Sequence, residues 1–304
     1  MTTLRRSTGF TLVELLVAMV IFSVVATLLT RMLITSQRVT TAQAVRASLQ
    51  SNLRVGSLVV PNELRMLNQS SETDIVDVSD TSIIYRAMRG YYALCAIPTS
   101  ATSIKVVRVA GTGFTFDYRA PQAGDSAFVH FENDTLKISD DVWVPVGISA
   151  VGTTTCNFGS GATLASRTAV TLTLSGTGIV NATYPWSKFQ SGAPVRSYET
   201  TRISLMASGG QNWLGMCTGS ATCSLQPVLG PLAPTNGLVI SRYNDVGTLV
   251  TGNTVANRNS LRYLKVQFIG VGETAISRGT DVGARTTIQD TLTTTVTLRN
   301  VKQN

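Results

Sequence analysis

The 304 residues are enough for one large domain or two small ones, and a hydrophobic content of 43% excludes a disordered chain. The formal net charge is +8, but the basic residues are scattered without a block of like charges. Composition therefore gives only weak support for binding to DNA or to anionic lipid.

The first feature along the chain is an apolar segment, residues 10–30, which follows a short leader containing Arg5 and Arg6. About 20 helical residues rising about 1.5 Å each can cross the roughly 30 Å hydrocarbon core of a bilayer, so the segment predicts one transmembrane helix. Glu14 is the only charged residue in the apolar segment before Arg31, and a carboxylate in hydrocarbon costs about 2 to 3 kcal/mol or more. Such a group needs a specific partner, which makes Glu14 a candidate functional residue.

Residues 9–14 have the sequence GFTLVE, which resembles the processing site of type IV prepilins and of type II secretion pseudopilins. The resemblance implies that a membrane peptidase cuts after Gly9 and N-methylates the new terminal residue, Phe10. It also implies that residues 1–9 form a cytoplasmic leader, in keeping with the basic residues there. Removal of this leader would leave 295 residues with a formal net charge of +6.

The resemblance also gives Glu14 a partner, namely the positively charged N-terminus of a neighbouring subunit as helices pack into a filament. The implied partners are other pilins and minor pilins, the prepilin peptidase, the inner membrane and the pilus assembly machinery. An uncleaved signal anchor with an accidental glutamate is the alternative. An ordinary secretory signal is less favoured, because the implied cut precedes the apolar run instead of following it.

The helical pattern continues beyond the apolar segment. Residues 31–60 contain no proline and only one glycine, Gly56. An apolar stripe recurs there at helical spacing, at Ala42, Val45, Leu49 and Leu53. The pattern predicts a helix from about residue 10 to about residue 60, near 75 Å long, that ends before Pro61. We expect the stripe to pack on the protein's own β-sheet.

After residue 68 the sequence changes to short β-branched and aromatic runs, broken by Gly, Pro, Asn and Asp. These runs predict strands at residues 82–88, 103–109, 113–119, 126–131, 142–148, 167–174, 198–206, 238–242, 261–271 and 291–298. Two stretches, residues 176–194 and 209–235, predict loops, and residues 272–287 predict an exposed excursion between the last two strands.

One long helix followed by many strands indicates an α+β fold, with the helix packed on a large, mainly antiparallel β-rich head, as in pilins. The expected parts are a leader at residues 1–9, a transmembrane or filament-core helix half at 10–30, an amphipathic half with its extension at 31–67, and a globular head at 68–304.

Four cysteines, Cys95, Cys156, Cys217 and Cys223, allow three complete pairings. Export of the head would place them in an oxidising periplasm, where disulfides are the default. Cys217 and Cys223 enclose a short polar stretch that a local bridge would close, which leaves Cys95 with Cys156. A zinc site is the competing interpretation, but the spacing is unusual for zinc ligands and the chain has one histidine, His130.

A second resemblance lies in the head. Residues 198–205, 234–243, 260–266 and 297–300 are similar to the C-terminal half of PilW-type minor pilins, which are related to the J-type pseudopilin of type II secretion. The length of the chain and the mid-chain position of its cysteines also differ from those of many major pilins. Many major pilins carry a helix-bending proline near the position at which this chain has Arg31.

No motif in the sequence indicates catalysis. The GxSxG, GxxxxGK[ST] and HExxH patterns are all missing from the sequence. A hydrolase triad would have to use His130, which we interpret as a partly exposed structural residue of a strand. Acidic residues at 72, 74, 77, 80, 140 and 141 could bind a cation, but they match no calcium loop, and solvated turns explain them better. We expect no metal and no cofactor.

The sequence thus predicts a non-enzymatic minor pilin of a type IV pilus. We expect it in the bacterial inner membrane with a periplasmic head, and then in the filament or its initiation complex near the tip. Because the tip-most subunit of the secretion system typically lacks the glutamate, we expect at least one subunit above this one. The alternatives are a J-type pseudopilin, an adhesin or DNA-uptake pilin, and, less favoured, a membrane-anchored periplasmic enzyme.

Overall fold

The computed structural model describes residues 11–67, 74–96, 102–108, 119–132, 141–158, 165–175, 189–220, 222–273, 275–277 and 285–298. Gly9, Phe10 and most of the strand predicted at residues 113–119 lie outside these ranges. The chain divides into two units, which we describe separately. The first comprises Met1–Ser51 with Val271–Asp290, and the second comprises Asn52–Gly270 with Thr291–Asn304.

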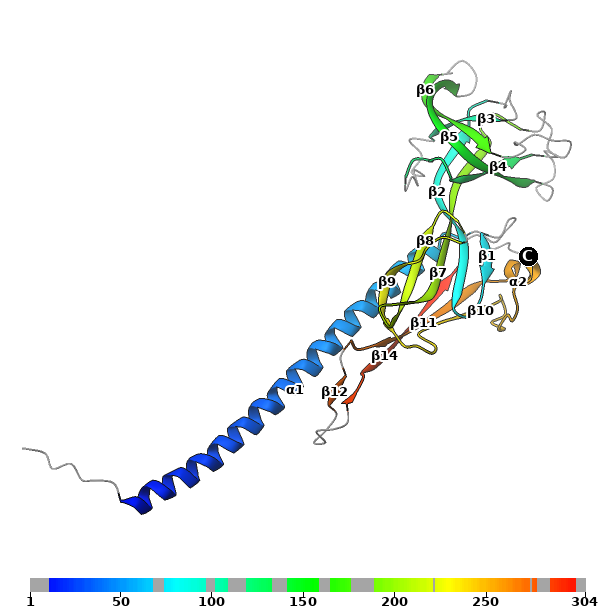
Figure 1. The fold of residues 1–304 in the computed structure, drawn as a ribbon. Helices are drawn as coiled ribbons and strands as arrows, with labels where there is room; N and C mark the ends of the chain where they lie inside the picture. The colour runs from blue at the N-terminus through cyan, green and yellow to red at the C-terminus, as the bar shows by residue number, and fades with distance from the viewer. Residues whose placement is uncertain are drawn as a thin grey trace, which may run out of the picture. The chain divides into compact units, whose positions relative to one another are not determined.

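A single long helix, α1 (Leu12–Leu64), occupies the N-terminal region (Figure 1). The sequence predicts that this helix ends before Pro61, but the helix continues for one further turn, to Leu64. A proline so close to the end of a helix removes only one backbone hydrogen bond, and the next turn still closes, because the Arg65 N–H donates to the Pro61 carbonyl at 2.9 Å. Pro61 and Leu64 are both buried, so packing offsets the lost bond.

The remaining described elements are mostly strands, and all their described pairings are antiparallel. The elements are β1 (Ile75–Val78), β2 (Ser82–Leu94), β3 (Ser103–Arg108), β4 (Ser126–Phe131), β5 (Val142–Phe158), β6 (Ala165–Ser175), β7 (Pro194–Ser208), β8 (Gln211–Thr218), β9 (Gln226–Leu232), β10 (Leu238–Tyr243), α2 (Val255–Asn259), β11 (Tyr263–Val271), β12 (Ile276–Ser277), β13 (Arg285–Thr286) and β14 (Gln289–Thr297).

Six strands of the second unit close into a small barrel. The pairings run from β2 to β3, β6, β5, β4 and β7, and β7 pairs with β2 to complete the ring. Aliphatic and aromatic side chains fill its interior. They are Tyr92, Leu94, Ile104, Val106, Ala127, Val129, Phe131, Val144, Val146, Ile148, Leu172, Leu174, Phe189, Ala193 and Val195. The barrel is therefore a packed core and not a channel.

Strands β2 and β7 belong both to the barrel and to an open sheet. The strand order of the open sheet is β1, β2, β7, β8, β9, β11 and β10, and β14 also pairs with β11. Figure 1 shows β2 and β7 passing from this sheet into the barrel. Ser82–Met88 of β2 pairs with the part of β7 that lies in the sheet, and Tyr92–Leu94 pairs with β3 of the barrel. Two continuous strands thus join the two halves of the head.

The C-terminal part of α1 packs on the open sheet of the same unit. Gly56 permits the close approach, because a Cβ atom at this position would lie 2.4 Å from Cδ2 of Leu229 on β9. The Asn52 side chain donates a hydrogen bond to the Gly230 carbonyl at 3.2 Å. Leu53 and Val60 are buried on this side of the helix. The contact is the helix-on-sheet packing that the sequence predicts.

An ion-pair network lies where β2 passes from the sheet into the barrel. A β-bulge in β2 between Met88 and Gly90 contains Arg89, whose guanidinium lies 2.5 Å from Glu199 on β7 and 3.7 Å from Glu63 on α1. Arg119 joins Glu199 to Asp125 at 2.5 and 2.7 Å. The network therefore links the helix, the sheet and the barrel by charge.

The first unit joins the N-terminal part of α1 to the segment that precedes β14. β12 and β13 form a short hairpin, so the segment predicted as an excursion has some regular structure. The Gly272 N–H donates to the Ile288 carbonyl at 2.8 Å, which brings the two ends of the hairpin segment together. A Cβ atom at Gly272 would lie 2.6 Å from Cγ1 of Val45, so the stripe residue Val45 packs directly on this backbone.

The fold class predicted from the sequence is confirmed. The predicted strands that lie in the described ranges are found, β4 at the predicted residues and the others with shifted ends, while the strand predicted at residues 113–119 stays a prediction. The loop predicted at residues 209–235 is wrong, because it contains β8 and β9. Glycine and proline suggested a loop there, but Gly215 and Gly230 lie where side chains crowd the strands, and Pro231 follows Gly230 through a cis peptide bond. The loop predicted at residues 176–194 reaches as far as Pro194, where β7 begins. Residues 176–188 of it lie outside the described ranges.

Two disulfides join Cys95 to Cys156 and Cys217 to Cys223, which is the pairing favoured by the sequence. The first connects the end of β2 to the outer part of β5, 61 residues later. The second closes the short loop after β8. Ser149–Phe158 of β5 extends past the residues that pair with β4, so the first bridge holds a projecting hairpin to the barrel.

Candidate functional site

The N-terminal half of α1 is an exposed apolar surface. Its mean hydropathy reaches 2.7 over 18 residues, none of them buried, so by length and composition this helix could cross a membrane. Fifteen large hydrophobic side chains from Leu12 to Leu33 are exposed, with Leu12 at 80%. A soluble chain rarely exposes a continuous apolar patch of this extent, so the surface needs lipid or a protein partner.

Glu14 lies in the first turn of α1 with its side chain exposed. Its backbone N–H donates to the carbonyl and to the hydroxyl of Thr11, at 3.1 and 3.3 Å, which begins the helix as an N-cap does. The structure shows no ion pair to the Glu14 carboxylate from any described residue. The carboxylate is thus available to a group from outside the described part of the chain.

The hydroxyl groups of the apolar helix are satisfied within the helix. The side chains of Ser23, Thr27 and Thr30 donate to carbonyl oxygens three or four residues earlier, at 2.7 to 2.8 Å. A polar group without a partner in hydrocarbon costs several kcal/mol, and these bonds remove that cost. Glu14 is therefore the one side chain of the described apolar segment for which burial in lipid or in a filament needs an outside partner.

His130, the candidate catalytic residue, contacts neighbouring side chains. His130 is half-buried on β4, with Nε2 3.7 Å from Asp141 and its ring edge against Trp143. Among the residues that the structure describes, no serine or cysteine is hydrogen-bonded to this histidine. This environment supports a structural histidine.

The acidic residues before β2 each contact a basic or amide group. Asp74 lies 3.7 Å from Arg196, Asp80 lies 2.8 Å from Arg242, and Asp77 accepts from the Asn253 side chain. No group of three or more potential metal ligands occurs in the described ranges. Asp140 and Glu72 lie outside them.

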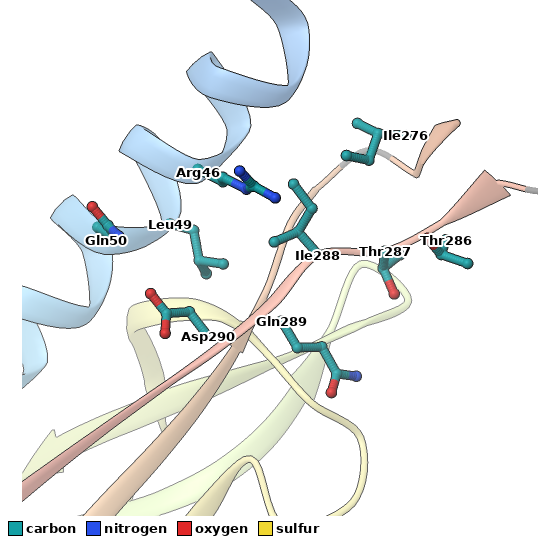
Figure 2. Close-up of a pocket in the computed structure, with 9 residues that line it drawn as sticks. All are labelled: Arg46, Leu49, Gln50, Ile276, Thr286, Thr287, Ile288, Gln289 and Asp290. Atoms are coloured by element: carbon teal, nitrogen blue, oxygen red, sulfur yellow. The ribbon is translucent and has the colours of Figure 1, made fainter. Parts of the chain in front are cut away.

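A groove of about 560 Å³ lies within the first unit, between α1 and the strands before β14 (Figure 2). Figure 2 shows Arg46 and Leu49 pointing from the helix toward Ile288. The lining residues are Arg46, Leu49, Gln50, Ile276, Thr286, Thr287, Ile288, Gln289 and Asp290. Most of the polar ones are exposed, so this is an open groove beside the helix and not an enclosed ligand cavity.

Sequence reasoning did not find the network around Arg89. Burial and the neighbouring carboxylate of Glu63 raise the pKa of Tyr85 well above its usual value, in that order of importance. The hydrogen bonds that Arg119 donates to Asp125 and Glu199 raise the pKa of its guanidinium, in spite of its partial burial. These residues come from four separate segments of the chain without a spacing signal, so no local pattern could have grouped them.

The described geometry thus singles out the N-terminal helix, and the comparison with known proteins points to the same segment. A family model described as a prokaryotic N-terminal methylation motif matches residues 4–30, which include Gly9, Phe10 and Glu14. No curated protein and no solved structure matches the chain. Proteins of this kind are in general processed by a prepilin peptidase and assemble with other pilins, and are not enzymes. Residues 4–30 are thus similar to the N-terminal methylation segment of type IV prepilin-like proteins, and the apolar helix that they begin is long and apolar enough to cross a membrane.

Proposed function

We propose that this protein is a minor pilin of a type IV pilus, cut after Gly9, N-methylated at Phe10 and incorporated into the filament through residues 10–30. The observation that carries the proposal is an exposed apolar helix, downstream of a methylation motif, whose carboxylate Glu14 has no described partner. The function is assembly and not turnover.

In this mechanism, different groups determine how tightly the N-terminal helix binds its neighbours and at which axial position the helices pack. Burial of the exposed apolar side chains against lipid or neighbouring helices supplies the affinity. Glu14 supplies the register, because a buried carboxylate is stable only where the methylated amino terminus of a neighbour meets it. A neighbour shifted by one turn would leave both charges unpaired, so the mismatch would be costly.

The proposed division of the chain follows from this mechanism. Residues 1–9 are the cleaved leader, residues 10–30 lie in the membrane and then in the filament core, and residues 31–67 carry the head of residues 68–304. Two features support a minor and not a bulk subunit. The head contains a whole barrel in addition to its sheet, and both disulfides lie away from the C-terminus. Since this chain has Glu14, we place it in the initiation complex with at least one subunit above it.

The test is mass spectrometry of the protein extracted from the membranes of cells that contain a prepilin peptidase. We expect a chain that begins at Phe10 and carries one additional methyl group. An intact N-terminus at Met1 in those cells, with other prepilins processed normally, would refute the proposal. A strain without the peptidase is the control, and there the full leader should remain.

A further inference from the structure

The helix beyond the apolar segment carries charge of one sign. Between Glu14 and Glu63 the charged residues are Arg31, Arg38, Arg46 and Arg54, without any aspartate, glutamate or lysine. In the part of the chain that the structure describes, no carboxylate forms an ion pair with these four arginines. Their charge is therefore left for a group outside those residues to balance.

Two of these arginines continue the face of the helix that packs on the protein itself. Arg31, Arg38 and Val45 follow one another at intervals of seven residues, so they share one face with a drift of about 20° per interval. Val45 packs against Gly272. Toward the N-terminus on the same face, Arg31 is exposed and Arg38 is partly exposed. We call Arg31 and Arg38 the arginine face.

A second copy of this chain is a poor neighbour for the arginine face. Packed helices lie about 8 to 10 Å apart, close to the Debye length of about 8 Å at physiological ionic strength, so charges on them are only partly screened. If Glu14 of one copy meets residue 10 of the other, the two helices are offset by four residues, about 6 Å. At that offset the nearest charged groups to each Arg31 are arginines of the second copy, and they repel.

We propose that the arginine face docks on the N-terminal helix of a different pilin-like subunit, one that carries aspartate or glutamate at the matching levels. The inference rests on the proposed function, because it takes the register from Glu14. Guanidinium groups form two parallel hydrogen bonds to a carboxylate, which adds direction to the charge attraction. The arginine face thus selects a heterologous neighbour, while the apolar segment supplies affinity to any pilin-like helix.

The chain itself can supply the acidic probe. The full-length protein and its R31E/R38E variant are labelled with a donor and an acceptor fluorophore and reconstituted together in phosphatidylcholine vesicles. Energy transfer is measured for the mixed pair and for each chain with itself, at low and high salt. The matched control is Arg54→Glu, which makes the same change on the same helix but about 140° away from Arg31.

We expect the mixed pair to associate at least about tenfold more tightly than the wild type with itself, with the preference lost in 0.5 M salt, and no preference for the Arg54→Glu control. Equal association of all pairs, or the same preference with Arg54→Glu, would overturn the inference. So would loss of the mixed-pair preference in phosphatidylglycerol vesicles with its retention in phosphatidylcholine vesicles, because the arginine face would then bind anionic lipid headgroups in preference to a carboxylate of another subunit.

A second measurement separates this inference from the proposed function. In the native cell, the R31E/R38E variant should still be cut after Gly9 and methylated, while its incorporation into filaments falls at least about tenfold. If the R31E/R38E variant is processed and incorporated normally, the inference about the arginine face is wrong, but the proposed function still holds. A wild-type chain that is not processed refutes the proposed function, whatever the vesicle experiment gives.

Discussion

Arg89 and Glu199 form a close ion pair, with Nη2 of the arginine 2.5 Å from Oε1 of the glutamate, at the point where β2 leaves the sheet for the barrel. Both side chains are nearly buried, at 10% and 11% exposure. The pair therefore fixes the bulged residue of β2 to β7, and α1 takes part through Glu63.

Removing the charge of Glu199 should destabilise the head. Glu199→Gln leaves Arg89 and Arg119 each with one fewer counter-charge in a partly buried site, and breaking such a pair costs about 3 to 5 kcal/mol. We expect the free energy of unfolding in urea to fall by about 3 kcal/mol. The exposed Lys265→Gln on β11 is the control and should change stability by less than about 0.5 kcal/mol. Equal stability of the two variants would contradict the role of the network.

Stability should decrease in strongly alkaline solution through Tyr85. Burial raises the pKa of this tyrosine above its usual value of 10.0, so the folded state favours the neutral phenol. The contribution is fully present below pH 10 and is lost as the pH rises toward the folded pKa, because the unfolded chain ionises first. Unfolding curves from pH 8 to 11 should show this loss. Tyr85→Phe should have a flatter profile over that range, and an unchanged profile would argue against Tyr85 as the cause.

The approach of α1 to the sheet should not tolerate a branched side chain at Gly56. Gly56→Val would place atoms against Leu229, which is itself buried, and overpacking of this kind costs about 1 to 3 kcal/mol. Thermal unfolding should show the loss. Gly152→Val is the matched control, because a Cβ atom there has no atom within 4 Å and the residue is exposed on β5. A similar loss in both variants would mean that the helix does not rely on close contact at Gly56.

The two disulfides should contribute unequally. Chain entropy predicts about 4 kcal/mol for the bridge that spans 61 residues and about 2 kcal/mol for the bridge that spans six. We expect the double variant C95A/C156A to unfold at lower urea than C217A/C223A. Proteolysis should also cut the projecting β5–β6 hairpin first in C95A/C156A, since an isolated hairpin is marginally stable. The opposite order of stability would contradict the entropic account.

Neutralising Glu14 should impair assembly without impairing processing. Glu14→Gln removes the partner for a neighbouring amino terminus, while Gly9 and Phe10 stay intact. We expect the membrane level of the processed protein to be unchanged and its amount in sheared filaments to fall at least about tenfold. Thr11→Val, which changes a neighbouring polar side chain but no charge, serves as control. Normal incorporation of Glu14→Gln would remove Glu14 from the mechanism.

Much of this architecture could be predicted from the sequence because its signals are local. The stripe at Ala42, Val45, Leu49 and Leu53 becomes half-buried to buried along α1, as a 3.6-residue period requires. β4 is found at the predicted residues, because its apolar run has clear ends. The motif around Gly9 likewise depends on adjacent residues alone.

What could not be predicted depends on distant residues. The ring closes only because β2 pairs with β7, more than 100 residues later, and no local pattern encodes that choice. β8 and β9 contain glycine and proline, which normally indicate loops, and packing against Trp213 and Met206 overrides that preference. Pro61 stays helical for a similar reason, because its burial offsets a missing hydrogen bond.

The pairing of Ala93 on β2 with Pro194 on β7 shows where the barrel segment could be removed or replaced. Paired residues of antiparallel strands lie about 5 Å apart, so the long segment between them leaves the sheet and returns to almost the same point. That segment holds β3, β4, β5 and β6, and it behaves as an insertion into a hairpin that could be closed by a short turn. The barrel can therefore lengthen, shrink or be exchanged while the sheet that carries the helix keeps its strand order.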